Sequence, residues 1–600
     1  MTTDHAPDPG TAGLSSPVSR RGFLRLIVAG AGVAVAGGLA AACGGSSSSP
    51  TAASGTGAQS TTASTTSSTA TTTSSGAGAS PVATSSASSS TSTSSGAAGG
   101  TLTVGTGLLF KSLDPARLYE VDSNMIAHAI YDALVTFDGE DLKTPKPSLA
   151  SKWEVATDGL SYTFTLQDNV KFVGGNPLTS TDVQWSLLRV KNVKGNPAFL
   201  LDPVSDIQTP DPKTAVVKLS EPSPSILPIL SSPSLGIIDS KTVQGKGGDA
   251  SAQAQNNDKA EPYLNSTSAG TGAYTLQKYT PSTEVDLVKN PNSWHGAPKL
   301  DRIVLRAITD PAAQKLQVEK GDLDIALSLT QDQLASMKSD QGVTVKTSVV
   351  AATFYVLMNN NATVGGIFAN PKVQQAVRLA LDYDGIMQIA GAGAQRLAGV
   401  IPTLFPGAWD PSNAPKQDQA QAKTLLQQAN AGDLKGAMSY ASDLTGYGVQ
   451  FSILAQKIQS DLAAVGITLT LDGLPGSTAL QKYRDAKDQI GVWSWTADYA
   501  DASDYLVYCP GRTVGKRAGW AADSTSPDAQ QLVTLAAQAE KEVDDQKRVA
   551  LYTQIDQMLA QNGPFAPLFL PAQPYAFRSN VQGVVNNSVW AIDLNVVSKS

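Results

Sequence analysis

An acidic residue among large aromatic side chains is the strongest candidate for a functional group in this sequence. The stretch runs from Val492 to Asp501 and reads VWSWTADYAD. A low local dielectric strengthens the pairing of a carboxylate with a cation, so Asp498 between these rings is suited to holding a positively charged group. The alternative is that the stretch is a core strand followed by an Asp-rich turn.

The sequence contains none of the common motifs of nucleophilic, nucleotide-dependent or zinc-dependent catalysis. Gly-x-Ser-x-Gly, Gly-x-x-x-x-Gly-Lys and His-Glu-x-x-His are all absent. The 3 histidines, His5, His128 and His295, have no neighbours at metal-ligand spacing, and His128 is expected to pack on a helix. The residues therefore give no indication of catalysis, and we expect no catalytic residue, no metal site and no cofactor.

Length and composition indicate a soluble protein of two or three domains. The 600 residues are 41% hydrophobic and 16% charged, with a net charge of −7. No basic stripe is present, which argues against nucleic acid as a partner.

The first hundred residues indicate export and anchoring. Arg20-Arg21 before an apolar Ala/Gly-rich run predicts a Tat-type signal peptide over residues 1–42. The run ends at LAAAC and resembles a bacterial lipobox, although Ala40 stands where a leucine is usual, so Cys43 is the expected lipidation site. Residues 43–100 are rich in Ser, Thr, Ala and Gly and are expected to form a flexible tether. With Cys43 lipidated, Cys509 has no disulfide partner, and we expect it to be a buried, unreactive thiol.

Local signals from residue 101 onward predict a mixture of strands and helices. TLTV at 101–104 reads as an opening strand, and Asp158-Gly159 predicts a hairpin turn. Thr179 with Asp182 predicts a capping box, and Asn370 predicts the start of a helix. Residues 432–449 read as an irregular insertion rich in Gly and Tyr.

Several motifs carry a resemblance to a known family. They are LASKWEV at 149–155, DGLSYTFTL at 158–166, VKF at 170–172 and PLTSTDV at 177–183. Further matches follow at GTGAYTL (270–276), NPNSW (290–294), KGDLDIA (320–326) and APLFL (566–570). The sequence resembles the extracellular solute-binding proteins of family 5, which serve ABC importers of oligopeptides, dipeptides and nickel.

The resemblance implies an α/β fold of the class II periplasmic-binding-protein type, with two lobes, an extra subdomain and a hinged cleft. Lobe I would comprise residues 101–133, 239–350 and 570–600. The subdomain of lobe I would comprise residues 134–238. Lobe II would comprise residues 351–569.

The same resemblance assigns roles to residues of the cleft. Asp498 would hold the α-ammonium group of a peptide, with Thr496 beside it. Trp495 and Tyr499 would form the walls of the pocket. The full set of expected ligand-binding residues is Asp498, Trp495, Tyr499, Thr496, Tyr119, Glu120, Val121, Phe354 and Tyr355.

Some assignments have alternatives. Phe354 and Tyr355 are equally well explained as core aromatics of a strand, and Asp501 and Asp504 read as a solvated or capping turn. Some peptide-binding relatives carry an arginine, which binds the ligand carboxylate, at the position of Val492. Because valine cannot bind a carboxylate, longer peptides, or ligands without a carboxylate, are more plausible here.

The function implied is a substrate-binding lipoprotein that captures oligopeptides and delivers them to an ABC permease. It would be a monomer on the outer face of the cytoplasmic membrane, lipid-anchored after Tat export. Alternatives are a member of the family that binds sugars or other solutes, and a receptor for a signalling peptide without transport.

Overall fold

A computed structural model describes residues 99–108 and 110–600. The expected signal peptide (1–42), Cys43 and the expected tether up to residue 98 lie outside the described residues. All described residues belong to one structural unit. Within them, no helix combines the length and the apolar composition that a membrane span needs.

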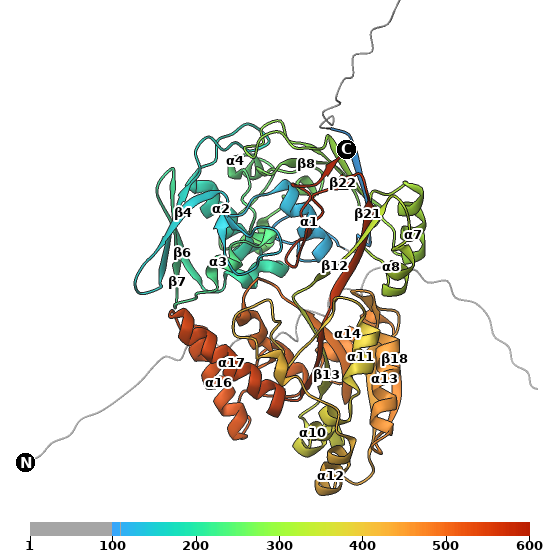
Figure 1. Ribbon diagram of the computed structural model, residues 1–600. Helices are drawn as coiled ribbons and strands as arrows, with labels where there is room; N and C mark the ends of the chain where they lie inside the picture. Colours follow the sequence, from blue (N-terminus) through green and yellow to red (C-terminus); the bar gives the residue numbers. More distant parts are fainter. Residues whose placement is uncertain (1–98, 109) are drawn as a thin grey trace, which may run out of the picture. The chain divides into compact units, whose positions relative to one another are not determined.

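A seven-stranded sheet forms the first lobe, here called lobe I (Figure 1). β1 is parallel to both of its neighbours, and the remaining pairs are antiparallel. In spatial order the strands are β12 (Val343–Val349), β21 (Ala572–Arg578), β11 (Ile325–Ala326), β1 (Thr101–Thr106), β10 (Arg302–Ala307), β9 (Glu284–Lys289) and β8 (Tyr274–Thr280). The longer helices of this lobe are α1 (Val121–Ile130), α7 (Pro311–Lys320) and α8 (Gln331–Met337). Lobe I is thus built from separate parts of the chain, including its C-terminal end.

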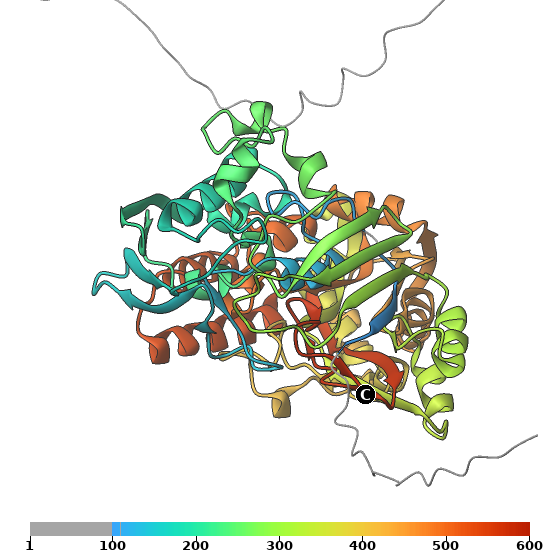
Figure 2. The ribbon, with the colours of Figure 1, turned by 90° about the horizontal axis from the view of Figure 1, so that it is seen from above.

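A four-stranded antiparallel sheet forms a subdomain beside lobe I, on the side away from α7 and α8 (Figures 1 and 2). Its strands are β4 (Ala150–Val155), β5 (Ser161–Leu166), β7 (Thr214–Leu219) and β6 (Val204–Asp211). The predicted hairpin is confirmed, with Gly159 at a positive φ of 69° in the turn between β4 and β5. The predicted capping box is confirmed too, because Thr179 and Asp182 exchange hydrogen bonds at the start of α2 (Ser180–Val193).

A six-stranded sheet forms lobe II. In spatial order its strands are β14 (Gln395–Arg396), β20 (Phe565–Leu570), β13 (Ala352–Met358), β19 (Ile490–Thr496), β15 (Lys435–Ala441) and β18 (Thr468–Leu474). The main helices are α10 (Pro371–Ala380), α11 (Tyr383–Ala390), α12 (Gln419–Ala429), α13 (Phe451–Ala463), α14 (Gly476–Arg484), α16 (Pro527–Ala539) and α17 (Asp545–Asn562). Asn370 caps α10 as predicted, by accepting a hydrogen bond from the Lys372 N–H.

Both faces of the lobe II sheet are buried, and β19 alternates between two cores. Ile490 and Val492 lie in one hydrophobic cluster, and Trp493 lies in the other. This alternation follows from the two-residue period of a strand. Residues on β19 that point to opposite faces therefore meet different surroundings.

The expectation of an irregular insertion at 432–449 is wrong in its first half. Residues Lys435–Ala441 form β15, which pairs in parallel with all of β18 and briefly with β19. The sequence of this strand, KGAMSYA, contains no β-branched residue, so its intrinsic preference for a strand is weak. Pairing with β18 and burial of Met438–Ala441 stabilise it as a strand.

The chain crosses between the lobes along two neighbouring paths. β12 continues through Val350 and Ala351 into β13, and β20 continues through Pro571 into β21 (Figure 1). The two paths are joined at the crossing, where the Val350 N–H donates to the Pro571 carbonyl oxygen at 3.0 Å. Two short connections of this kind form a hinge that lets the lobes rotate with little change inside either sheet.

A buried charge network fixes the turn of lobe I that leads to Tyr119. Arg189 of α2 is fully buried and donates to both oxygens of Asp114 (2.6 and 2.7 Å) and of Asp258 (2.8 and 2.9 Å). Burial acts to raise the pKa of Asp258, but the hydrogen bonds and charge of Arg189 outweigh it and hold this pKa below its usual value. Asp114 in turn accepts from the Ala116 N–H, so the network shapes the chain just before Tyr119.

We expect the substitution Arg189→Met to lower the free energy of unfolding by about 3–5 kcal/mol, measured by urea titration. It leaves two buried carboxylates with Arg117 as their remaining basic partner. The matched control is Lys435→Met, which breaks an exposed pair with Asp433 and should change stability by less than about 1 kcal/mol. Equal effects of the two substitutions would contradict a structural role for the buried network.

Candidate functional site

The strand that leads to Asp498 has one open edge. β19 pairs with β13 over its full length, but β15 pairs only with Ile490 and Gly491. The Ala497 N–H donates to the Ala351 carbonyl oxygen. The backbone N–H and C=O groups of every second residue before Ala497 therefore also point toward β13. The backbone N–H and C=O groups of Ser494 and Thr496 therefore face the opening where β15 and β19 part.

Asp498 lies just beyond this open edge and is partly buried. Burial raises its pKa to about 6, and this rise is partly opposed by the Tyr119 hydroxyl and the charge of Arg517. The Tyr119 hydroxyl donates a hydrogen bond to Oδ1 of Asp498. Because Tyr119 belongs to lobe I and Asp498 to lobe II, this hydrogen bond joins the two lobes.

The expectation that Asp504 belongs to a solvated turn is wrong. Asp504 is only 3% exposed, and burial together with the charge of Asp498 raises its pKa well above the usual value. Its Oδ2 accepts from the Trp495 Nε1–H and from the Asp498 N–H, both at 3.1 Å. Asp504 thus orients both the indole and the backbone of the site.

Asp501 does cap a turn, as one of the two readings proposed. It accepts from the Ser503 N–H at 2.9 Å at the start of the 3₁₀ helix η5 (Ala502–Tyr508). It also pairs with Arg548 of α17 at 3.0 Å and is itself buried. The segment after Asp498 is therefore held rigidly against α17.

Tyr119 reaches the site from the start of α1. Glu120 occupies the N-cap position of α1, and the Asp114 turn precedes Tyr119. The Tyr119 ring makes an edge contact with Phe199 of the subdomain, at 6.1 Å between ring centres. Burial and the nearby Asp498 raise the pKa of Tyr119, so its hydroxyl keeps its proton and acts as the donor.

A cavity of about 220 Å³ lies between the lobes, and its lining includes residues two positions from Tyr119 and from Asp498 but neither of these two residues. Residues that line it include Val121, Asp122, Ser328, Tyr447, Thr496 and Gln573. The Tyr447 hydroxyl lies 2.6 Å from Oγ1 of Thr496, and the Asp122 carboxylate accepts from Thr106 at 2.7 Å. The cavity is lined by residues of both lobes and by the hinge residue Val350.

The structure brings most of the expected site residues to this region. Val121 and Thr496 line the cavity, and Trp495 and Tyr119 contact the two carboxylates. Glu120 directly precedes Val121 and is half-buried. Tyr499 contacts the hydrophobic cluster of the subdomain, so it spans the two lobes.

Phe354 and Tyr355 have a different environment. Both are fully buried, on opposite faces of β13. Phe354 stacks on Phe569 at 4.6 Å, and the Tyr355 hydroxyl lies 2.6 Å from that of Tyr483. Their contacts are those of core aromatics, the alternative that the sequence left open. His128 stacks on Trp590 at 4.0 Å between ring centres, as expected of a packing histidine, and Cys509 is a buried free thiol.

Arg517 and Tyr447 near the site were not anticipated from the sequence. Arg517 lies over the Trp495 ring, and Tyr447 comes from the segment read as an insertion. Neither position stands in a motif, and each reaches the site only because of tertiary folding. A further contact between the lobes, Lys541 to Glu221 at 2.7 Å, was also not anticipated.

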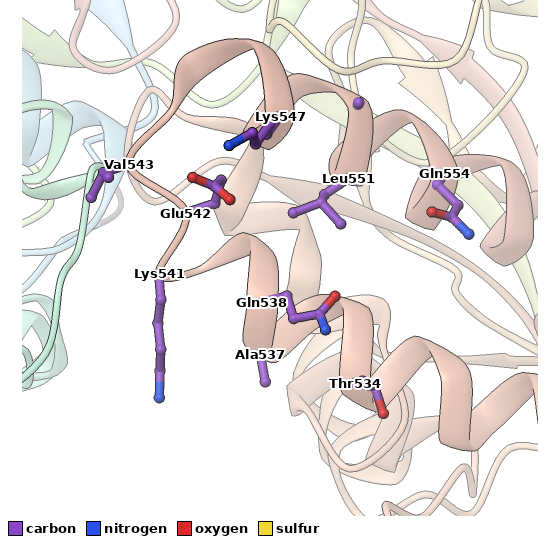
Figure 3. Close-up of a pocket in the computed structure, with 10 residues that line it drawn as sticks. Thr534, Ala537, Gln538, Lys541, Glu542, Val543, Lys547, Leu551 and Gln554 are labelled. Atoms are coloured by element: carbon purple, nitrogen blue, oxygen red, sulfur yellow. The ribbon is translucent and has the colours of Figure 1, made fainter.

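A larger groove lies on the surface between α16 and α17 (Figure 3). Its volume is about 880 Å³, and its lining includes Thr534, Gln538, Leu551 and Gln554. Its lining residues come from the two helices and their connection and include none of the expected ligand-binding residues, whereas Val121 and Thr496 line the cavity between the lobes. We therefore assign the candidate site to the region of Asp498 and not to this groove.

Comparisons with known proteins agree on one family. Residues 144–515, more than half of the chain, match the profile described as bacterial extracellular solute-binding proteins, family 5 (middle region). The chain is 27% identical over 530 residues to di/tripeptide-binding protein 2 of Pseudomonas aeruginosa, covering 83% of this chain and 94% of that protein. It is 24% identical over 507 residues to the probable D,D-dipeptide-binding periplasmic protein DdpA of Escherichia coli, with the same coverage.

Solved structures confirm the fold. The substrate-binding protein CtaP of Listeria monocytogenes superposes with a TM-score of 0.72 at 20% identity, over 84% of this chain and 100% of the other. A dipeptide-binding protein of a Pseudoalteromonas species, solved with Met-Leu, gives 0.69 at 21% identity, over 83% and 100%. The two-lobed α/β fold expected from the sequence is therefore confirmed.

We expect Tyr119→Phe to shift the ligand-free protein toward an open form, because it removes a hydrogen bond from one lobe to a carboxylate on the other. Such bonds contribute about 1.5–3 kcal/mol. The measurement is the distance between one spin label in each lobe, by pulsed electron resonance.

Tyr279→Phe is the matched control for this substitution, since the one partner of the Tyr279 hydroxyl among the described residues is the Phe110 carbonyl oxygen, within lobe I. It should leave the distance distribution unchanged. Identical distributions for Tyr119→Phe and the native protein would show that the hydrogen bond does not hold the lobes together.

Proposed function

The chain belongs to the bacterial extracellular solute-binding proteins of family 5, and from this premise we propose that it captures short peptides between its lobes for an ABC importer. The observation that carries the proposal is Asp498, a partly buried carboxylate with a raised pKa at the end of an open strand edge. Such a site matches the α-ammonium group and the main chain of a peptide. The peptide-binding names of several relatives support the same ligand class.

The ammonium group of the ligand binds Asp498. A carboxylate removed from water is unfavourable unless a cation or strong donors compensate for the lost hydration. Tyr119 supplies one donor, yet burial keeps the pKa of Asp498 raised, which supports a site with room for a further positive partner. A ligand cation supplies that partner.

The main chain of the ligand lies along the open edge of β19. Ser494 and Thr496 offer backbone donors and acceptors there, and an extended peptide adds to such an edge as an extra strand. Main-chain pairing is independent of side-chain identity, so it suits a protein that accepts peptides of varied sequence.

Closure of the lobes completes the binding event. The cavity has walls from both lobes, so a ligand in it contacts both and stabilises the closed form. The hinge at Val350 and Pro571 permits the rotation. The closed, loaded protein is the form that meets the permease subunits, and no chemical reaction is required.

The protein acts at the outer face of the cytoplasmic membrane. Arg20-Arg21 and the apolar run after them support Tat export, and Cys43 supports lipid anchoring. The Ser/Thr-rich residues 43–100 give the anchored protein the reach to meet its permease. We expect it to work as a monomer.

The substitution Asp498→Asn tests the ligand class. We expect the affinity for short peptides, measured by calorimetry, to fall by two decades or more, because a buried ion pair loses one partner. The control Asp433→Asn changes an exposed carboxylate of lobe II and should leave affinity unchanged. A thermal shift with sugars and none across a peptide library would contradict the proposal.

The pH dependence of binding gives a second readout of the same variant. Below about pH 6 the ligand-free Asp498 is protonated and cannot pair with an ammonium group, so native affinity falls as pH falls. The fall is about tenfold per pH unit, down to the lower pKa of the bound state. Asp498→Asn has no carboxylate to titrate at this position, and its affinity should lose this dependence.

The substitution Cys43→Ser tests the anchor separately. It removes the thiol to which lipid would be attached, so we expect the protein to move from the membrane fraction to the soluble extracellular fraction. Immunoblotting of the two fractions is the measurement. Retention of the variant in the membrane fraction would contradict lipid anchoring and leave the peptide proposal intact.

A further inference from the structure

Phe199 leaves an aromatic ring uncovered one side chain away from Asp498. It belongs to the short 3₁₀ helix η1 (Asn196–Leu201) of the subdomain, and 40% of its surface is exposed. The Tyr119 ring lies 6.1 Å from the Phe199 ring, measured between ring centres, and the Tyr119 hydroxyl donates to Asp498. A single tyrosine side chain therefore connects this exposed phenylalanine to the carboxylate proposed to hold the ligand.

Close packing of η1 fixes the position of the phenylalanine ring. Leu200 and Leu201 are buried in the hydrophobic cluster of the subdomain and anchor the helix there. Gly195 directly precedes the helix and packs against the turn before Tyr119, because a Cβ atom at Gly195 would lie 2.1 Å from the Ala116 carbonyl oxygen. The two segments that carry the aromatic rings are thus packed backbone against backbone.

The buried charge network stabilises both partners of the aromatic pair. Arg189 lies toward the end of α2, which leads directly into η1. Its carboxylate partner Asp114 begins the turn before Tyr119. The Tyr119 and Phe199 rings are therefore held together by lobe I and its subdomain, independently of lobe II.

Exposed apolar side chains gather beside Tyr119. Among residues 99–108 and 110–600, eight large hydrophobic side chains are exposed, and Phe199 and Val121 are two of them. Phe199 contacts the Tyr119 ring, and Val121 follows Tyr119 by two positions and lines the cavity between the lobes. Single exposed apolar residues are common on protein surfaces, but two at the same functional residue give the site an apolar border that a ligand can cover.

We propose that Phe199 packs against the side chain of the ligand's first residue, so that the site prefers peptides that begin with a large apolar or aromatic residue. This inference rests on the proposed function, because it places the ammonium group of that residue at Asp498. The first side chain leaves the same carbon atom that carries the ammonium group, so it is the ligand side chain nearest to Asp498. Aromatic rings pair best at edge or offset contacts of about 4.5–7 Å between centres, and the uncovered part of Phe199 leaves room for such a contact.

The test compares the tripeptide Phe-Ala-Ala with trialanine, which differs from it only in the first side chain. We expect the native protein to bind Phe-Ala-Ala about tenfold more tightly, as measured by calorimetry, because the contact covers apolar surface on two rings. Phe199→Ala should abolish the difference between the two affinities. Phe199→Leu, which keeps an apolar side chain without a ring, should retain part of the difference, and the melting temperature of each variant reports whether it is folded.

Leu316→Ala is the matched control. Leu316 is a similarly exposed apolar side chain on α7, on the other side of lobe I from the subdomain (Figure 1), so the native preference should persist. Equal native affinities for the two peptides, or an unchanged ratio of affinities in a folded Phe199→Ala variant, would overturn the role of Phe199 and leave peptide capture standing. Binding of neither peptide by the native protein would overturn both proposals together.

Discussion

The carboxylate of Asp498 is partly buried where the lobes meet, and the behaviour of the protein depends on how the lost hydration is compensated. A hydroxyl donor from Tyr119 compensates in part, but it carries no charge. The charge of Arg517 also opposes the effect of burial, yet the pKa of Asp498 stays raised. A cationic ligand group compensates for the rest of the lost hydration of Asp498 only when the lobes are closed around it. Ligand affinity and lobe closure are therefore two aspects of the same electrostatic balance.

This electrostatic balance requires each lobe to hold its interacting group in a fixed position: the Tyr119 hydroxyl in lobe I and the Asp498 carboxylate in lobe II. In lobe I, Arg189, Asp114 and Asp258 fix the turn before Tyr119 through fully buried hydrogen bonds. In lobe II, Asp504 holds the Trp495 indole and the Asp498 backbone, and Asp501 ties the next segment to α17. Motion is left to the two crossings at the hinge. A charge held on a rigid lobe cannot relax toward water by a local loop movement, so it responds to the ligand or to lobe opening.

Local chemistry explains which features could be predicted from the sequence. The Thr179–Asp182 box, the Asn370 cap and the Asp158-Gly159 hairpin depend on neighbours in the chain, and all three are confirmed. The family and the two-lobed fold are confirmed because long motifs carried them. β15 was missed because its stability comes from β18, and the burial of Asp504 was missed because it depends on packing. The Tyr119–Asp498 contact joins residues 379 positions apart, a separation that no local pattern reports.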